Sequence, residues 1–348
     1  TLSGGGGAIY SGGSLNVSNS SFINNSAKNN GASIYTTGDT NVKDSIFNST
    51  NASGKAIIHI EKFSYMDPFV VILSNNSIHS NLIPIENDGG DIISPTTLTF
   101  QNVTVLAGET ATLTAILTDD MGDIIESNSN VMGKVGDRYV TFVPQESTRN
   151  FVATYSQTQN RGIYTIAGNY SHATHCTVVE GVLNVEGVSV NEFNVNIDGK
   201  VYGNFSGNIT IIPSDATGNV TIKVNGTKYG QVRLFNGKAN WLLTNLTPGN
   251  YNITFEYSGD GKYYPAINST IVNITKATIK PDDVKVNVIN STYGNVTIEV
   301  TVPEDATGNI TLIIEGDDYT VPIVNGTALF ELGNNVTVGE HKITVVYN

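Results

Sequence analysis

The side chains best suited to metal binding or nucleophilic chemistry in this chain are five histidines and one cysteine. Two of the histidines and the cysteine stand together in the run His172-x-x-His175-Cys176. Imidazole nitrogens and thiolates are preferred ligands of Zn²⁺. Residues three positions apart in a strand point to opposite faces, so this set converges only where the chain turns. We interpret the run as a short hairpin loop, and we assign neither a metal ion nor a catalytic nucleophile to it.

Aspartates gather in several predicted turns. The groups are Asp119, Asp120 and Asp123, then Asp282 with Asp283, then Asp317 with Asp318. Grouped carboxylates are suitable ligands for a hard cation such as Ca²⁺. Aspartate is also favoured in turns because its side chain accepts hydrogen bonds from nearby backbone N–H groups. Both interpretations stay open, and no cation is assigned.

The sequence lacks the common catalytic signatures. It contains no GxSxG, no phosphate-binding GxxxxGK[ST], no HExxH and no CxxC. An internal cross-link between lysine and asparagine would need a buried lysine beside an acid, whereas Lys223 and Lys238 stand among polar neighbours. We therefore predict that the chain is not an enzyme, and we assign no catalytic residue, no cofactor-binding residue and no cofactor.

The charge balance argues against two classes of partner. Acids outnumber bases by 31 to 18 in the 348 residues, for a formal net charge of −13. Nucleic acids and anionic membranes both require a dense basic face. A membrane helix needs about 20 apolar residues, and the longest apolar run covers only residues 69–73. We expect no nucleic-acid partner and no membrane insertion.

Asparagine is abundant, with 42 copies, and the pattern Asn-x-Ser/Thr recurs along the chain. Such sequons mark glycosylation of exported surfaces, although a chain this rich in Asn, Ser and Thr also produces them by chance. The ends of the sequence, at 1–4 and 345–348, carry neither a signal peptide nor a complete strand pattern. We expect a glycoprotein fragment from an extracellular, cell-surface protein whose signal peptide and anchor lie outside it.

A first repeat covers residues 1–83. Gly-Gly-Ala-Ile-Tyr at 6–10 recurs as Gly-Ala-Ser-Ile-Tyr at 31–35, and Val17 and Phe22 recur as Val42 and Phe47. A period of about 25 residues, with short strands separated by Gly and Asn, is typical of one rung of a parallel β-helix. A looser third copy follows, which predicts that the solenoid ends here.

A second repeat is clearer. Pro-Ser-Asp-Ala-Thr-Gly-Asn at 213–219 matches Pro-Glu-Asp-Ala-Thr-Gly-Asn at 303–309, and Tyr202 matches Tyr293. Strand signals every 8–12 residues within each copy of this repeat are typical of an immunoglobulin-like sandwich. Residues 98–187 form a more distant copy. Trp241 lies on an alternating apolar face, so we expect it to pack in a core and not to act as a sugar platform.

Two segments resemble a tyrosine corner, in which a tyrosine early in the sixth strand bonds back across a turn. They contain Tyr164 and Tyr251, and the last copy has His341 instead, which puts that bond in doubt there. The fold class predicted for the chain is all-β, with the C-terminal end of a right-handed parallel β-helix followed by tandem Ig-like sandwiches. Its expected parts are a β-helix at 1–85, a linker at 86–97, and sandwiches at 98–187, 188–276 and 277–348, the last cut short.

The GGAI and FxxN motifs, at 6–9 and 22–25, resemble repeats of polymorphic β-helical surface proteins. Together with the sandwich repeats and the Tyr-Ser-Gly-Asp-Gly-Lys-Tyr-Tyr-Pro run at 257–265, they resemble adhesin-like proteins of methanogenic archaea. The second rung departs from both motifs. This resemblance implies an extracellular archaeal stalk that attaches cells to other cells or to polymers.

The resulting hypothesis is a monomeric adhesin fragment. Its expected partners are the surfaces of other microbial or host cells, or cell-surface polysaccharide, contacted through β faces and through loops such as 259–265. Tyr263 and Tyr264 are adjacent there, and the alternative is an ordered loop with one tyrosine packed inward. Two other functions remain open: a spacer without a ligand, and a fragment of a β-helical polysaccharide-active enzyme.

Overall fold

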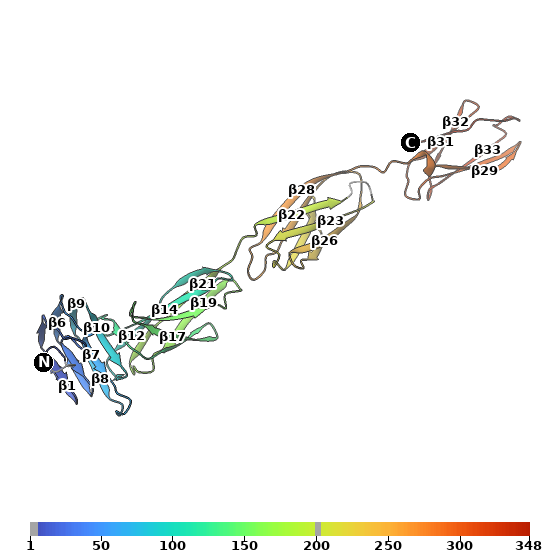
Figure 1. Ribbon diagram of the computed structural model, residues 1–348. Helices are drawn as coiled ribbons and strands as arrows, with labels where there is room; N and C mark the ends of the chain where they lie inside the picture. The colour runs from blue at the N-terminus through green and yellow to red at the C-terminus, as the bar shows by residue number, and fades with distance from the viewer. Residues whose placement is uncertain (1–5, 199–202) are drawn as a thin grey trace. The chain divides into compact units, whose positions relative to one another are not determined.

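The computed structural model describes residues 6–198 and 203–348, and their regular structure is almost entirely β-strand (Figure 1). The exception is a 3₁₀ turn at Pro281–Asp283. Across the described ranges, no helix is long and apolar enough to cross a membrane. The chain is thus all-β, as expected. The opening residues 1–4 and the repeat residue Tyr202 fall outside the described ranges.

Contacts divide the chain into two compact units. The first comprises Thr1–Asn196, Asn208–Asn240 and Ile253–Ser269, and the second comprises Ile197–Gly207, Trp241–Asn252 and Thr270–Asn348. Because the division runs through the predicted sandwich at 188–276, the domain boundaries drawn from the sequence stay a prediction.

Three parallel sheets occupy the N-terminal part of the first unit. One has the order β1-β4-β7-β10-β15, with bounds Ile9–Ser11, Ile34–Thr36, Ala56–Glu61, Ile83–Asp88 and Ile125–Glu126. A second has the order β11-β8-β5-β2, with bounds Asp91–Ile92, Val70–Ser74, Thr40–Lys43 and Leu15–Ser18. The third has the order β3-β6-β9, with bounds Ser21–Ile23, Ile46–Ser49 and Ser77–Ser80.

The sequence repeat sets the register of these sheets. Val17 pairs with Val42, and Phe22 pairs with Phe47 with their rings stacked 4.7 Å apart. Positions that match in the repeat are therefore neighbours in space, which lets identical apolar side chains stack on one another.

Residues 86–97, expected to form a linker, lie largely in strands. Glu86 belongs to β10, and Ile92 belongs to β11 and is fully buried. Ile125, in β15, continues the first parallel sheet by pairing with Ile85. One continuous apolar core then runs from Val17 to Val185. Since the parallel sheets and the first sandwich share this core, no free linker separates them.

A nine-stranded sheet follows, in the order β13-β21-β19-β16-β17-β18-β14-β12-β20. The bounds are Val103–Leu106, Gly181–Glu186, Gly162–Asn169, Val131–Val135, Arg138–Gln145, Asn150–Tyr155, Ala111–Thr118, Thr96–Phe100 and Cys176–Val179. Strand β17 pairs with β16 through residues 138–142 and with β18 through residues 143–145. It therefore passes from one layer of the sandwich to the other.

The next strands form two sheets. One has the order β22-β23-β26, with bounds Glu192–Asp198, Gly203–Ile212 and Lys238–Leu246. The other has the order β25-β24-β27-β28, with bounds Thr227–Arg233, Asn219–Val224, Gly249–Tyr257 and Ala266–Ile274. Trp241 is buried, as its alternating apolar pattern predicted.

The last strands repeat this layout. One sheet has the order β29-β30-β33, with bounds Lys285–Thr292, Asn295–Thr301 and Thr327–Gly333, and the other has the order β32-β31-β34, with bounds Asp317–Pro322, Asn309–Ile314 and Thr344–Tyr347. In Figure 1, β31 and β32 lie on one side of this part and β29 and β33 on the other. Ile298, Leu312 and Phe330 belong to its separate core.

The backbone conformation explains why the second repeat has glycine at two matching positions. Gly218 and its counterpart Gly308 adopt φ angles of +98° and +109°. A Cβ atom on Gly218 would also lie 2.7 Å from the carbonyl oxygen of Gly259. Left-handed φ and close backbone approach both favour glycine, so the turn requires it in each copy.

Candidate functional site

The tyrosine corners are formed, and the third copy forms one with histidine. Tyr164 donates from its hydroxyl to the carbonyl oxygen of Asn160 at 3.0 Å, and the Tyr251 hydroxyl lies 2.9 Å from Oγ1 of Thr247. Nε2 of His341 lies 2.8 Å from the carbonyl oxygen of Thr337. The bond that the sequence left in doubt is thus present, because an imidazole N–H reaches the same position as a phenol.

The tyrosine-rich loop between β27 and β28 is held from within. Tyr263 is buried and donates from its hydroxyl to Oδ1 of Asp215 at 2.6 Å. Asp260 accepts backbone N–H bonds from Thr217, Lys262 and Tyr263, at 2.7 to 2.8 Å. The pKa of Asp215 lies below its usual value, chiefly because the Tyr263 hydroxyl and then Lys262 stabilise its charge. The loop is ordered by its own hydrogen bonds, which matches the alternative of an ordered loop with one tyrosine packed inward.

The same loop meets the first sandwich. The Gly187 N–H donates to the Tyr264 hydroxyl at 3.1 Å, and the Val188 N–H donates to the carbonyl oxygen of Lys262 at 2.9 Å. The Arg161 N–H donates to the carbonyl oxygen of Gly261 at 2.7 Å, while its guanidinium lies 5.2 Å from the centre of the Tyr264 ring. We call these contacts the joint. The loop expected to be a ligand-binding tip lies in this joint.

The side chains of the run His172-x-x-His175-Cys176 each make different contacts. His172 contacts Asp91 through Nδ1 at 2.9 Å, and Nδ1 of His175 lies 2.9 Å from the carbonyl oxygen of Ile93. Cys176 begins β20, where it pairs with Thr96. The three side chains do not converge, because the run pairs along residues 91–96 as an added strand segment.

In the acidic turn at residues 119–123, the carboxylates accept hydrogen bonds from backbone N–H groups. Asp119 is buried, and its Oδ1 accepts from Met121 at 3.0 Å and from Asp123 at 2.9 Å. Burial raises the pKa of Asp119 to about 6, against the opposing effect of these bonds. Asp120 accepts from the Asn75 N–H.

The remaining acidic pairs lie apart from that turn. Asp283 accepts from the Lys280 N–H at 2.9 Å, and Asp317 and Asp318 lie exposed at the start of β32. Each group therefore has a local structural role or faces solvent.

The lysines considered for a covalent cross-link lie at the surface. Lys223 pairs with Glu256 at 2.6 Å, with about a third of each side chain exposed, and Lys238 is exposed. This placement agrees with the solvent-facing positions expected for both.

A buried polar cluster lies at positions whose residue types do not recur at the spacing of the sequence repeat. Nε2 of His59 lies 3.8 Å from Oε2 of Glu86 and 3.6 Å from Oδ2 of Asp88. Lys55 contacts Glu86 and lies 3.6 Å from Oδ2 of Asp88. Burial raises the pKa of Glu86, against the opposing effect of the Lys55 bond. Among the described residues this is the one group of three or more such side chains whose ligand atoms lie within 4.8 Å of one another.

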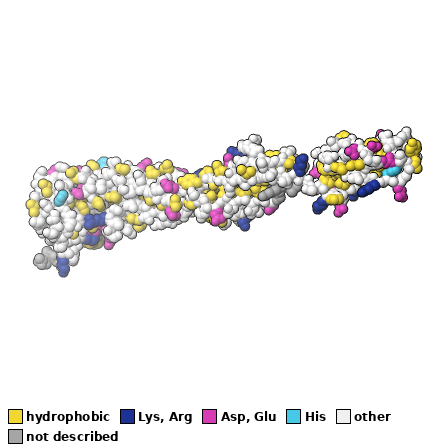
Figure 2. Space-filling view, turned by 90° about the horizontal axis from the view of Figure 1, so that it is seen from above, with side chains coloured by type: hydrophobic (Ala, Val, Ile, Leu, Met, Phe, Trp, Pro, Cys, Tyr) yellow, Lys and Arg dark blue, Asp and Glu magenta, His cyan; other side chains and the backbone are white. Residues whose placement is uncertain are grey.

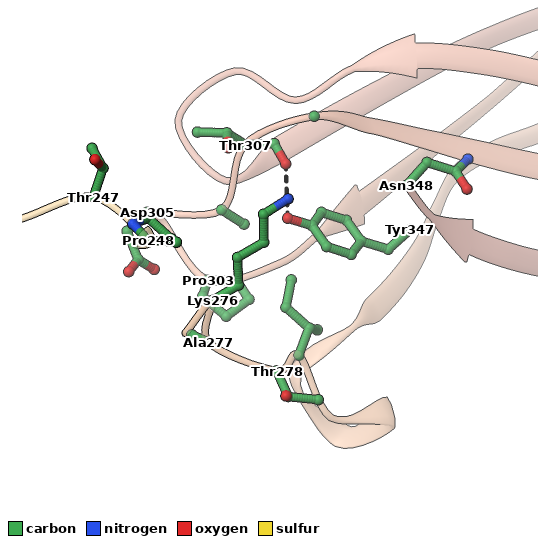
Figure 3. A pocket seen from close by; sticks show the side chains of 13 residues that line it. Thr247, Pro248, Lys276, Ala277, Thr278, Pro303, Asp305, Thr307, Tyr347 and Asn348 are labelled. Carbon is green, nitrogen blue, oxygen red and sulfur yellow. Dashed lines mark hydrogen bonds between the residues drawn. The ribbon is translucent and has the colours of Figure 1, made fainter. Parts of the chain in front are cut away.

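A hollow within the second unit is lined by residues of several loops (Figure 3). Its volume is about 470 Å³, and Lys276 and Asp305 supply its charged side chains. The Tyr347 hydroxyl donates to the carbonyl oxygen of Thr307 at 2.7 Å (Figure 3). That hydroxyl is therefore already engaged with the backbone of its own sandwich.

Charged side chains are thinly distributed on the face seen in Figure 2. Lys and Arg lie there in small separate groups, mixed with acids and surrounded by uncharged surface. This distribution agrees with the low charged fraction of 14%, and it leaves that face without the basic patch that phosphate binding requires.

Residues 195–275 match the Bacterial Ig-like domain (group 3). No curated protein matches the chain. The match runs from within β22 to the end of β28, and the strands from β29 to β34 repeat this layout with one strand fewer.

Several solved structures align with the chain at low sequence identity. The Yersinia pseudotuberculosis adhesin InvE is 14% identical, over 65% of this chain and 72% of that one, with a TM-score of 0.35. The Escherichia coli adhesin FdeC is 10% identical, over 72% and 88%, with a TM-score of 0.28. Fibronectin(III)-like modules of Clostridium thermocellum CbhA are 16% identical, over 51% and 94%, with a TM-score of 0.23. Likenesses of this size carry no argument about function, so what the chain shares with known proteins is the bacterial Ig-like sandwich at 195–275.

Proposed function

We propose that the chain is part of an extracellular surface adhesin in which Ig-like sandwiches form a stalk. The observation that carries this proposal is the bacterial Ig-like domain at 195–275, followed by a second copy of the same layout from β29 to β34. Modules of this kind bury their apolar residues between two sheets and leave outer faces and loops for contact.

The parallel sheets support a further part of the proposal. Their registers, such as Val17 with Val42 and Phe47 with Ile78, follow the sequence repeat. We assign them to the end of a right-handed parallel β-helix, as in the adhesin-like proteins of methanogenic archaea that the repeats resemble. The numerous sequons support a glycoprotein exposed outside the cell.

Attachment through such a chain is multivalent. Copies held on one surface face a second surface together, and linked binding events raise avidity by about 10²–10⁴ without any new contact. The proposed partners are surfaces of other microbial or host cells, or their polysaccharides. We expect one monomeric chain to bind weakly and a dense array of chains to bind firmly.

A passive spacer is the second candidate function. It is favoured by the loop at 259–265, whose Tyr263 is buried and whose Tyr264 lies in the joint. Surface residues that hold two modules together serve a stalk directly and leave fewer side chains for a ligand.

The test is attachment of chain-coated beads to microbial cells and to cell-surface polysaccharides. The full chain and a chain ending at residue 276 are coupled at equal density, with beads carrying an unrelated acidic β-protein as the control. Retention of full-chain beads above that control supports an adhesin, and its loss in the shorter chain places contact on the last sandwich. Retention no better than the control for both chains would leave the spacer.

A further inference from the structure

A ladder of polar and aromatic side chains crosses the first parallel sheet. Register partners run from Tyr35 in β4 to His59 in β7, Glu86 in β10 and Glu126 in β15. Asp88 lies two residues beyond Glu86, on the same face of its strand. Parallel pairing brings side chains of neighbouring strands within about 5 Å, so residues far apart in sequence meet on one face.

The centre of the ladder contains buried polar atoms that have no hydrogen-bond partner. His59 is only 2% exposed, and neither of its ring nitrogens has a hydrogen-bond partner. Three carboxylate oxygens are also buried without a hydrogen-bond partner: Oε2 of Glu86, Oδ1 of Asp88 and Oε2 of Glu126. Buried polar atoms are nearly always paired, because an unpaired one forfeits its hydration. So many unpartnered polar atoms on one face of the sheet indicate a ligand that would bind to them.

The charges of the cluster do not balance. Glu86, Asp88 and Glu126 supply three carboxylates, and Lys55 supplies one ammonium group at their edge, with about half of its side chain exposed. Arg149 and Glu146 also act on Glu126, and their opposite charges leave the carboxylates of the cluster in excess. The excess of negative charge in a buried place favours a cation over an anion or a neutral ligand.

We propose that His59, Glu86 and Asp88 bind a divalent transition-metal ion, with Zn²⁺ as the best fit. The nitrogen–oxygen separations of 3.6 and 3.8 Å are close to the roughly 3.4 Å between ligand atoms of a tetrahedral zinc site with bonds of about 2.1 Å. Lys55 contacts Oε1 of Glu86, so Oε2 stays available to the ion.

The donor set selects the class of metal. One imidazole nitrogen with two carboxylates suits Zn²⁺ and its first-row neighbours, whereas Ca²⁺ and Mg²⁺ prefer an all-oxygen shell. His59 binds through Nε2, and a water molecule would complete four ligands.

The site would join β7 to β10 and so connect two successive rungs. A metal that binds only the folded chain stabilises it by mass action. We therefore expect the ion to strengthen the parallel sheets where the sandwich begins, which is a structural role independent of any adhesive ligand.

The experiment is calorimetric titration of the full 348-residue chain with ZnCl₂ after treatment with a chelator, alongside parallel titrations with CaCl₂ and MgCl₂. We expect one Zn²⁺ ion per chain and a raised melting temperature of the N-terminal part. His59→Gln should weaken binding by at least about 100-fold, since even indirect partners of a metal change affinity by 10–100-fold. Asp88→Asn should weaken it likewise, and is informative if His59→Gln fails to fold.

His79→Gln is the matched control, because His79 is an exposed histidine in β9 of the same region. His172→Gln controls for zinc bound at the surface beside Asp91. Both variants should bind as the unaltered chain does. Lys55→Met should bind zinc more tightly, because it removes the cation that competes for the two carboxylates.

Several results would overturn the proposal. They are absence of zinc binding by the folded chain, equal binding by the folded His59→Gln or Asp88→Asn variant, loss of binding in His172→Gln, and preference for Ca²⁺ over Zn²⁺. Failure of zinc to stabilise Lys55→Met would identify the cluster as an ion-pair network that needs its lysine.

Discussion

At the scale of single residues, a ring reaches back four residues in each of three sandwiches, to a backbone carbonyl in two of them and to Oγ1 of Thr247 in the other. Tyr164 reaches back four residues to a backbone carbonyl, and His341 does the same with Nε2. His341 also contacts Glu315 through Nδ1 at 3.0 Å, so its ring is held from both sides. Both a phenol and an imidazole can therefore make the backbone contact of the corner.

Replacing Tyr164 with phenylalanine should remove the corner bond and keep the ring. We expect the first sandwich to lose about 0.5–1.5 kcal/mol of unfolding free energy, the net value of one hydrogen bond. Denaturant titration of the variant measures this loss. Tyr139→Phe is the control because Tyr139 is 75% exposed, and equal losses in both variants would show that the corner bond contributes nothing.

Asp119 should make the first sandwich lose stability as the pH rises. Its pKa is about 6 in the folded chain and 3.8 ordinarily, so the folded state binds a proton that the unfolded state releases between these values. The stabilisation is complete below about pH 4 and lost as pH rises through 6, by about 2–3 kcal/mol.

Asp119→Asn should flatten this part of the pH profile, because an amide does not titrate. Unfolding free energies at pH 4 and pH 7 measure the effect, with Asp137→Asn at an exposed position as the control. A profile unchanged by Asp119→Asn would assign the pH dependence to other groups.

At the scale of elements, the loop between β27 and β28 has two functions. Its inner side holds Tyr263 against Asp215, and its outer side presents Tyr264 to Gly187 and Arg161. Local bonds alone could order the loop, but only the neighbouring sandwich gives Tyr264 its partners. A loop that looked adhesive from its composition therefore acts as a joint.

Tyr264→Phe should loosen the joint at one amide. The variant keeps the ring near Arg161 and removes the acceptor for the Gly187 N–H. We expect that amide to exchange its hydrogen about 2–10 times faster, the equivalent of one net hydrogen bond. The Val188 amide, bonded to the carbonyl oxygen of Lys262, should change little. Unchanged exchange at Gly187 would mean that the tyrosine hydroxyl does not contribute to the joint.

At the scale of the whole molecule, the described residues contain more than one apolar core. The core from Val17 to Val185 includes both the parallel sheets and the first sandwich, and that of Ile298 and Leu312 belongs to the last sandwich. Cooperative unfolding follows packed cores, so the parallel sheets should unfold with the first sandwich even though their strand pattern differs.

Ile125→Ala tests this coupling. Ile125 is fully buried, and its truncation should cost about 2–5 kcal/mol throughout the shared core. Native-state hydrogen exchange should show faster opening in β5 and in β14 together. Leu312→Ala, at an equally buried position, should affect the last sandwich and leave β5 and β14 unchanged. Faster exchange in β14 alone would mean that the parallel sheets unfold independently.

Much of the architecture is local and was predictable. The alternating pattern around Trp241, the 25-residue recurrence of Phe22 and Phe47, and the glycines at 218 and 308 all reflect backbone preferences or nearest-neighbour stacking. The placement of residues 86–97 was not predictable in this way. Their composition resembles a linker, and they form strands because the preceding rung supplies hydrogen-bond partners.

The candidate metal cluster escaped prediction for a related reason. His59 and Glu86 are register partners, but the rungs differ in length, so a search for acids at a constant period passes over them. The side chain types also differ from strand to strand along the ladder.

The amino-acid sequence by itself determined the strand class, the repeats, the turns and the apolar faces, because these depend on side-chain alternation and on φ angles that few residues adopt. Only the tertiary structure decided that β15 joins the parallel sheet, that Tyr264 lies in a joint and that His59 meets Glu86 and Asp88. Each of these depends on the pairing of strands distant along the chain, and such pairing is decided by the total area and hydrogen bonding of the folded state.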